Sequence, residues 1–311
     1  MAAHERIGPY ELIEDIAVGG MATVHLARER TATGATLVAL KRMRADLARE
    51  GSVVRLFHAE AQLGVRLVHP NVCRVLAGGS HAGIPFITME WLVGETADAL
   101  LGSERWRRER TASHAVRIVM DAAAGLHAAH ELLDADGVSL GTVHADVCPQ
   151  NVMVTYAGEV KVIDFGIAQF AGSRPAAALR GRVAYMAPEQ IEQHAFDRRA
   201  DVWALGVMLW ELLTGERLFV RNGDPATMYA VMEAPIAPPS QVRLDLSPVL
   251  DDIVMRALQR RPDHRYATAR DLAIALAPFA SASRTLGGWM QGAFAEQFAS
   301  KRAQVARVSM R

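Results

Sequence analysis

A glycine-bearing turn between two β-prone runs contains the first residues whose types suit chemistry. It reads Ile16-Ala17-Val18-Gly19-Gly20-Met21-Ala22-Thr23-Val24. Small residues let a backbone approach a phosphate group closely. The turn does not open a helix, so neither the P-loop nor the dinucleotide-binding pattern applies. Taken alone, it leaves phosphate binding and an ordinary hairpin both open.

A lysine stands in the otherwise apolar strand Val38-Ala39-Leu40-Lys41. Burying an ammonium group alone is costly, so Lys41 must reach solvent at an edge or meet a buried anion. Glu60 lies in the next helical stretch, on the side that carries Phe57 and Ala61, and is the expected partner. These residues alone do not exclude an exposed surface pair.

Three further segments place these features in one ordered pattern. They read Val143-His144-Ala145-Asp146-Val147-Cys148-Pro149-Gln150-Asn151, Val160-Lys161-Val162-Ile163-Asp164-Phe165-Gly166 and Ala187-Pro188-Glu189. In this order they resemble the catalytic-loop, D-F-G and A-P-E motifs of protein kinases. The resemblance runs from about Tyr10 to Pro278. The sequence looks most like the eukaryotic-type (Hanks-type) serine/threonine kinases of bacteria, whose glycine loops often read G-G-M.

The resemblance implies transfer of the γ-phosphoryl group of Mg-ATP to a Ser or Thr hydroxyl of a protein. Lys41, positioned by Glu60, would hold the α- and β-phosphates, and Asp146 would orient or accept the hydroxyl proton. Asp164 and Asn151 would hold Mg²⁺, which prefers hard oxygen ligands. Adenine would bond to the backbone around Glu90 to Leu92 and pack among Val24, Ala39, Met89 and Met153.

Other matches to the family are structural in kind. Glu189 and Arg265 resemble an ion pair that anchors the end of the activation segment, and Asp201 resembles the aspartate that supports the catalytic loop. His144 is scaffold in the family, so we expect no acid-base role for it. The A-P-E region favours a protein kinase over a small-molecule kinase, whose related fold usually lacks that region.

The sequence departs from the family in the glycine turn and in the activation segment. Ala17 and Ala22 replace two glycines, yet we expect nucleotide binding to survive. Ala145 replaces the arginine that usually receives an activation-loop phosphate. Between Asp164 and Glu189 the only hydroxyls are Ser173 and Tyr185, and the usual threonine is missing. Both losses predict activity that does not depend on phosphorylation of this loop.

A further departure changes the charges near the transferred phosphoryl group. Cys148 stands where serine/threonine kinases usually carry a lysine, and Arg182 replaces the partner threonine of the activation segment. We hypothesise that Arg182 restores the lost positive charge, because a guanidinium group suits phosphoryl oxygens. The alternative is that Arg182 lies in a basic loop that is exposed to solvent. Cys148 is interpreted first as a small buried residue, since a reactive thiol would need a lowered pKa.

The elements that must position these residues are mostly strands at first and helices later. Strands are expected at Tyr10 to Ala17, Thr23 to Arg30, Ala35 to Met43, Val72 to Ala77 and Ile84 to Trp91, around a helix from Val54 to Val68. Helices are expected at Ala115 to Glu131, Val202 to Leu213, Met228 to Ala234, Pro248 to Gln259 and Ala269 to Pro278. Two short strands, Val152 to Thr155 and Val160 to Ile163, lie between them. This order predicts an α+β fold with a small β-rich N-lobe and a larger helical C-lobe.

Composition excludes several other classes of protein. The 311 residues carry 34 Lys+Arg against 34 Asp+Glu and are 50% hydrophobic, which disfavours disorder and a nucleic-acid binder that relies on bulk charge. The two cysteines, Cys73 and Cys148, form no disulfide or zinc spacing. The longest apolar run, Val202 to Thr214, is too short to span a membrane and is interrupted by Glu211. The charged N-terminus does not resemble a secretion signal, so a cytoplasmic protein is expected.

The tail after the matched region carries an apolar stripe at helical spacing. Its members are Leu286, Trp289, Met290, Ala293, Phe294, Gln297 and Phe298, and basic residues follow from Lys301. Packing against the helical lobe is the favoured interpretation. A helix that docks a partner or a membrane surface is the alternative.

We therefore predict an N-lobe at 1–91, a C-lobe at 92–278 and an amphipathic helical tail at 279–311. The predicted function is an ATP- and Mg²⁺-dependent protein kinase that phosphorylates Ser or Thr. A nucleotide-binding pseudokinase that serves as a scaffold is the first alternative. Retention of Lys41, Glu60, Asp146, Asn151 and Asp164 argues against it. The sequence does not indicate the physiological substrate or the oligomeric state.

Overall fold

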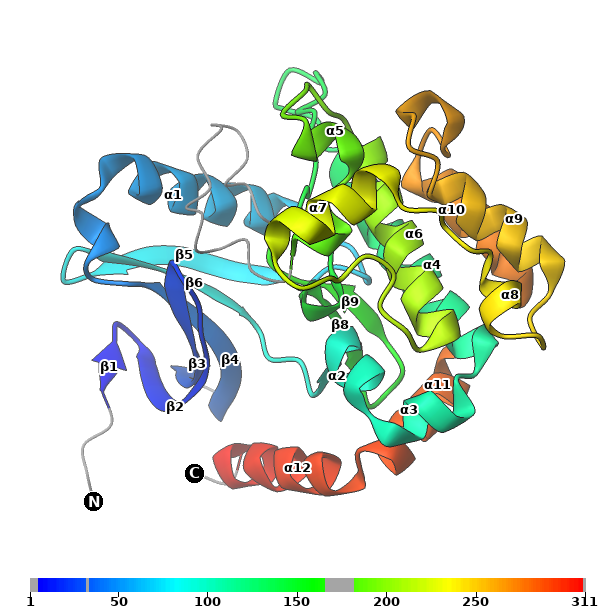
Figure 1. Ribbon diagram of the computed structural model, residues 1–311. Coiled ribbons are helices and arrows are strands. Elements are labelled where there is room, and N and C mark those ends of the chain that lie inside the picture. The colour runs from blue at the N-terminus through cyan, green and yellow to red at the C-terminus, as the bar shows by residue number, and fades with distance from the viewer. Residues whose placement is uncertain (1–4, 32–33, 166–181, 310–311) are drawn as a thin grey trace.

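The computed structural model describes residues 5–31, 34–165 and 182–309, and Figure 1 shows the chain folded into two lobes. Within these ranges, six strands of the first lobe form one antiparallel sheet in the order β1-β2-β3-β4-β6-β5, with helix α1 packed on it. The elements are β1 (Arg6–Ile7), β2 (Tyr10–Val18), β3 (Ala22–Thr31), β4 (Gly34–Met43), α1 (Gly51–Arg66), β5 (Val75–His81) and β6 (Ile84–Glu90). The predicted β-rich N-lobe with one main helix is confirmed.

Strand β4 shows how the sequence directs side chains to the two faces of this sheet. Alternate residues of a strand point to opposite faces. Val38 and Leu40 are buried in a cluster with Tyr10 and Phe86. Ala39 and Met43 are buried in another cluster, together with residues of α1. Lys41 has the same parity as Ala39, so the alternation directs it toward α1 and the space between the lobes.

The strand predicted at Val72 to Ala77 is wrong at its start, because β5 begins at Val75. The first two residues of the predicted strand pair with the second lobe instead. Val72 forms a parallel bridge with Val162, and the backbone N–H of Cys73 donates to the Val162 carbonyl at 2.8 Å. Strand β1 was not predicted, because two residues are too few to show a period of two.

The second lobe is helical, as predicted. Its elements are β7 (Gly94–Thr96), α2 (Ala97–Gly102), α3 (Glu104–Glu109), α4 (Ala112–His130), β8 (Val152–Thr155), β9 (Val160–Val162), α5 (Pro188–Ile191), α6 (Arg199–Thr214), α7 (Asp224–Glu233), α8 (Pro239–Val242), α9 (Pro248–Ala257) and α10 (Ala269–Leu276). The five predicted helices correspond to α4, α6, α7, α9 and α10. Helices α2, α3, α5 and α8 were missed, since each has six residues or fewer.

Helix α6 is the core of this lobe. Every residue from Ala200 to Thr214 is buried, so the apolar run is a core helix as expected. Glu211 is the acidic residue that interrupts this run, and it has polar partners. Its carboxylate accepts from the Tyr185 hydroxyl at 2.7 Å and from Arg217 at 3.0 Å. A buried carboxylate needs such partners. In the part of the chain that the structure describes, no helix is both long and apolar enough to cross a membrane.

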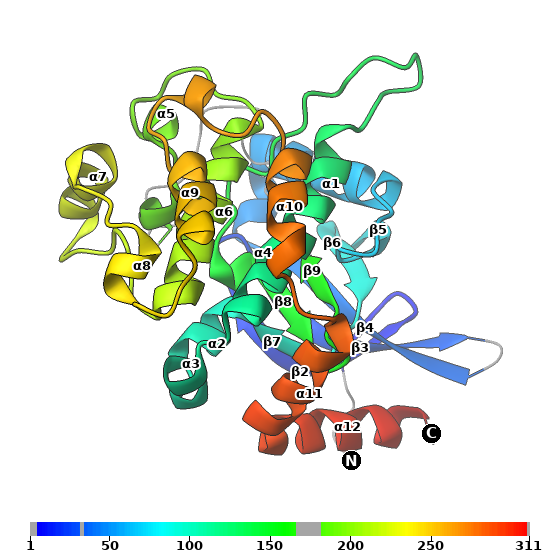
Figure 2. The ribbon, with the colours of Figure 1, turned by 90° about the vertical axis from the view of Figure 1, so that its right-hand side faces the viewer.

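The tail forms two helices, α11 (Ser283–Ala293) and α12 (Ala295–Ser309). Leu286, Trp289, Met290 and Phe294 of the predicted stripe are buried in the core of the C-lobe. The favoured interpretation, packing against the helical lobe, is therefore confirmed for α11. Helix α12 continues past the C-lobe and contacts β4 of the N-lobe, and Figures 1 and 2 both show it crossing below the junction of the lobes.

Candidate active site

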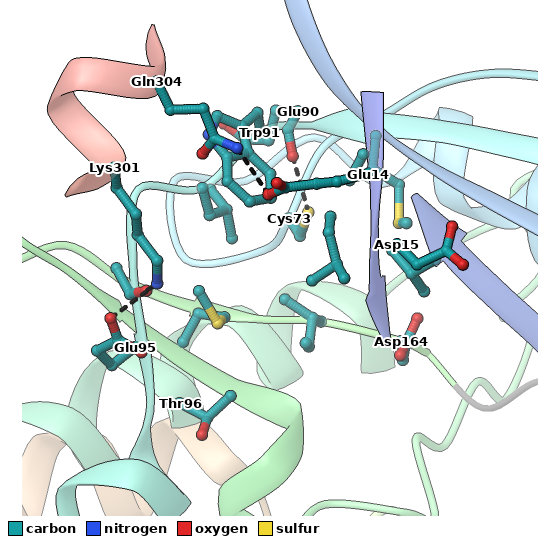
Figure 3. A pocket seen from close by; sticks show the side chains of 18 of the residues that line it. Glu14, Asp15, Cys73, Glu90, Trp91, Glu95, Thr96, Asp164, Lys301 and Gln304 are labelled. Atoms are coloured by element: carbon teal, nitrogen blue, oxygen red, sulfur yellow. Dashed lines mark hydrogen bonds and ion pairs between the residues drawn. The ribbon is translucent and has the colours of Figure 1, made fainter. Parts of the chain in front are cut away.

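The candidate site is a cleft of about 570 Å³ between the two lobes. Its apolar walls include Val24 and Ala39 from the N-lobe and Met153 from the C-lobe. Met89, Glu90 and Leu92, where the chain passes from β6 into the second lobe, line it as well. Figure 3 shows the cleft with Asp164 at one end. Its shape and lining suit a flat apolar ring with polar groups toward one end.

Lys41 lies between two carboxylates near that end. Its Nζ is 2.6 Å from Glu60 Oε1 and 3.0 Å from Asp164 Oδ1. Burial lowers the pKa of Lys41, but the charges of Asp164 and Glu60 outweigh burial and raise it above its ordinary value. The Lys41 ammonium in turn lowers the pKa of Asp164. Lys41 therefore stays protonated and Asp164 ionised at neutral pH.

The catalytic loop is held by one buried aspartate of α6. Asp201 accepts from the backbone N–H of His144 at 2.9 Å and of Ala145 at 2.7 Å. It also bonds to His130 Nε2 at 2.7 Å. Ala145 has φ +57°, a left-handed conformation that a residue with a Cβ adopts at a cost. The two bonds from Asp201 help to stabilise this turn, which immediately precedes Asp146.

Asp146 is held together with Asn151 and Arg182. The Asn151 amide donates to the Asp146 carbonyl at 2.9 Å and to its Oδ2 at 3.4 Å. The Arg182 guanidinium donates to the same Oδ2 and forms an ion pair. The side chain of Asp146 is 8% exposed and that of Arg182 is 38% exposed. Arg182 therefore reaches the predicted catalytic aspartate from the far end of the activation segment.

His144 bonds to backbone through both ring nitrogens. The N–H of Asp146 donates to its Nδ1 at 3.2 Å, and its Nε2 donates to the Ile163 carbonyl at 3.3 Å. Its ring packs on Phe165 with centroids 4.8 Å apart. Both nitrogens are thus occupied in joining the catalytic loop to the segment that carries Asp164, which agrees with a scaffold role.

Cys148, two residues after Asp146, is fully buried. Burial, with a smaller contribution from the Asp146 charge, raises the pKa of this thiol to about 12. A thiol with such a pKa is not a nucleophile at neutral pH. Cys148 fits the interpretation of a small buried residue.

Glu189 and Arg265 form the buried ion pair that the sequence predicted. Arg265 Nη1 and Nη2 lie 2.6 and 2.7 Å from the two carboxylate oxygens of Glu189. Two parallel charged bonds of this kind fix relative orientation as well as distance. They attach the start of α5 to the loop before α10, and so fix the chain just after Arg182.

The predicted nucleotide-binding residues divide into two groups. One group lines the cleft: Ile16, Val24, Ala39, Met89, Glu90, Leu92 and Met153. The other lies outside that lining and comprises Lys41 and the turn from Ala17 to Thr23. In the turn, the N–H of Gly19 donates to the Ala22 carbonyl at 2.9 Å and closes the hairpin. Ser173 and Gly166 lie outside the described residues.

Several cleft residues were not expected from the sequence. They are Glu14, Asp15, Cys73, Gly94, Glu95, Thr96, Ile163 and four residues of α12, namely Ser300, Lys301, Gln304 and Arg307. Apart from Ile163, which precedes Asp164 in its motif, no short motif marks them, since chain folding brings them to the cleft. The only available signal was the group of basic residues after the apolar stripe of the tail.

The residues expected to hold Mg²⁺ offer suitable atoms. Asn151 is buried and its amide nitrogen is bonded to Asp146, so its carbonyl oxygen is the group left for a metal. Asp164 supplies a carboxylate that its surroundings keep ionised. Hard oxygen donors of this kind fit Mg²⁺.

Two lobes around a cleft, with a buried lysine paired to a helical glutamate, define the protein-kinase fold. The chain belongs to the protein kinase domain family, whose model matches residues 10–274. It is 38% identical over 310 residues to the tyrosine-protein kinase MasK of Myxococcus xanthus, a match that covers 96% of this chain and 48% of that protein. It is 36% identical to the serine/threonine-protein kinase PknB of Mycolicibacterium smegmatis, over 85% of this chain and 41% of PknB.

A solved structure shows the same fold. The kinase domain of Mycobacterium tuberculosis PknI superposes with a TM-score of 0.67 and 26% identity, over 90% of this chain and 99% of that domain. The present chain spans less than half the length of the curated relatives MasK and PknB. The identification as a Hanks-type bacterial kinase domain, expected from the motifs, is confirmed.

Proposed function

We propose that this chain is a protein kinase domain that transfers the γ-phosphoryl group of Mg-ATP to a Ser or Thr hydroxyl of a protein. The observation that carries the proposal is Lys41, which contacts Glu60 and Asp164 at the end of an apolar cleft. Phosphoryl transfer needs fixed positive charge beside the phosphates and an oriented acceptor. Lys41 supplies the charge, and Asp146 supplies a carboxylate to orient the acceptor.

Each residue has a role in this proposal. Lys41 binds the α- and β-phosphates, and Glu60 positions it. Asp164 and Asn151 would hold Mg²⁺, which would neutralise phosphate charge when bound. Asp146 orients the hydroxyl and takes its proton, while Arg182 provides a cation near the transferred group.

The proposal includes activity without phosphorylation of the activation segment. Ala145 stands at the usual position of the phosphate-binding arginine, and it is buried with its carbonyl bonded to Gln190 at 3.1 Å. Its methyl side chain carries no charge that could bind a phosphate group. Arg265 and Glu189 hold the end of the segment without any modification.

Tyrosine is the second candidate acceptor. Cys148 replaces the lysine that usually marks serine/threonine kinases, and MasK is named a tyrosine-protein kinase. Phosphoamino-acid analysis of the labelled product decides between the two acceptors.

The test is incubation with labelled Mg-ATP, alone and with a generic protein acceptor. We expect incorporation that is lost in Asp146→Asn and Lys41→Met. The pseudokinase alternative predicts nucleotide binding to the folded protein without Asp146-dependent incorporation, and that result would overturn the proposed activity.

A further inference from the structure

Helices α11 and α12 lie beyond the family match, which ends at residue 274, yet α11 is built into the C-lobe. Its backbone touches the β8-β9 turn directly. A Cβ at Gly158 would meet the Ser283 carbonyl oxygen at 1.9 Å, and one at Gly287 would meet the Ala157 backbone at 2.7 Å. Trp289 packs edge-on against Trp106, with ring centroids 5.1 Å apart. These contacts fix the start of α12.

From this anchor α12 bonds to both sides of the cleft. Lys301 Nζ donates to the Gly94 carbonyl at 2.5 Å and to Glu95 Oε1 at 2.7 Å, at the start of the second lobe. Gln304 Nε2 donates to Glu14 Oε1 of β2 at 2.6 Å. Residues three apart lie on one face of a helix, so a single face of α12 spans the two lobes.

The same face is a wall of the nucleotide cleft. Lys301 and Gln304 line it together with Val24, Ala39 and Met153. Figure 3 shows these two side chains at the end of the cleft opposite Asp164. Because Lys41 and Asp164 mark the phosphate end, the helix borders the nucleoside end.

Glu95 is held where it can accept hydrogen bonds. Its carboxylate accepts from Lys301 and from the Tyr156 hydroxyl, and its side chain is 17% exposed. Burial and the Glu95 charge raise the pKa of Tyr156, so its hydroxyl remains a donor. Ribose hydroxyls are donors that a fixed carboxylate suits, and Lys301 offsets a negative charge that would repel a triphosphate.

We propose that α12 is part of the nucleotide site, where Lys301 positions Glu95 to bind the ribose hydroxyls and Gln304 holds Glu14 across the mouth of the cleft. This proposal rests on the proposed function, in which ATP occupies the cleft. It adds positioning residues from a segment outside the family match.

The test measures direct binding of a non-hydrolysable ATP analogue and of its 2′,3′-dideoxy form, so it does not require transfer. We expect Lys301→Met to weaken binding of the ribose analogue by about tenfold, the effect of losing one charged hydrogen bond. The dideoxy form should lose less affinity. Glu95→Gln should also reduce discrimination between the two. Arg302→Met is the matched control, since it removes the same charge from the exposed side of α12.

Kinetics give a second readout. Lys301→Met should raise KM for ATP by a similar factor and leave kcat within about twofold, which general damage to the fold would not do. Unchanged affinity and unchanged discrimination in both Lys301→Met and Glu95→Gln, with unaltered thermal unfolding, would overturn this proposal alone. Nucleotide binding without Asp146-dependent transfer would instead overturn the proposed activity. Absence of nucleotide binding by the unmodified chain would overturn both.

Discussion

The guanidinium group of Arg182 forms an ion pair with the carboxylate of Asp146, 36 residues earlier in the chain. In the family pattern a lysine two residues after the catalytic aspartate provides a cation at this point, but here that position is the buried Cys148. The structure thus brings a cation to the catalytic loop from the opposite end of the activation segment. A guanidinium group can bond to a carboxylate and still offer donors to phosphoryl oxygens.

Arg182→Ala should lower kcat by about 100-fold, the usual effect of losing one donor aimed at transition-state charge. Arg182→Lys should retain part of the rate, because it keeps the charge without the planar fork. Steady-state phosphorylation and thermal unfolding of each variant provide the measurement. A rate in Arg182→Ala equal to or above that of the unmodified chain would show that Arg182 has no catalytic role or restrains Asp146.

Cys148→Lys should reduce activity when Arg182 is present, because it places a second cation in a buried site. Cys148→Lys combined with Arg182→Thr should recover activity, since the pair then matches the usual family pattern. A double-mutant cycle should give a coupling of about 0.5–3 kcal/mol. Additive effects of the two changes would mean that the residues do not compensate for each other.

Both cysteines should resist alkylation in the folded protein. Burial raises the pKa of Cys148 to about 12 and also raises that of Cys73. A raised thiol pKa keeps the reactive thiolate scarce until the pH approaches that value, so little reaction is expected at about pH 8. Mass spectrometry after iodoacetamide treatment, with and without denaturant, checks this. Rapid labelling of native Cys148 would contradict its assignment as an inert residue.

Arg265→Ala should destabilise the protein by about 3–5 kcal/mol, because it leaves Glu189 buried without its partner. Arg265 is 3% exposed and Glu189 is 7% exposed. Arg44→Ala is a matched control that breaks an exposed pair with Asp46 and should change stability little. Denaturant unfolding gives both values, and equal effects would show that the buried pair is not structurally important.

Gly287→Ala and Gly288→Ala should have opposite effects, although both lie in α11. A Cβ at Gly287 meets the Ala157 backbone, whereas one at Gly288 meets nothing within 4 Å. We expect Gly287→Ala to destabilise the protein by about 1–3 kcal/mol and Gly288→Ala to stabilise it by up to about 1 kcal/mol. Thermal and denaturant unfolding measure both. A Gly287→Ala protein as stable as the unmodified chain would show that α11 can move away from the β8-β9 turn.

The sequence was sufficient to predict those features that depend on the order and spacing of residues along the chain. Lys41 lies in a strand with apolar neighbours, and Asp146 and Asp164 lie in segments of fixed spacing, so motif order predicted them as site residues together with the fold. The apolar run of α6 and the pairing of Glu189 with Arg265 were likewise expected. In each case the physical requirement is burial of an apolar surface or of a paired charge. Neighbouring residues or a motif indicate that requirement in the sequence.

Only the tertiary structure decided which distant residues meet. The switch of Val72 and Cys73 to the C-lobe sheet depends on a backbone partner at Val162 that periodicity does not reveal. The contact of Lys301 with Glu95 joins residues 206 apart and arises because α11 fixes the direction of α12. The sequence by itself therefore determined the fold and the residues Lys41 and Asp164 that meet at one end of the cleft. Packing of the tail decided which residues of α12 line the cleft, because long-range contacts depend on geometry rather than on spacing along the chain.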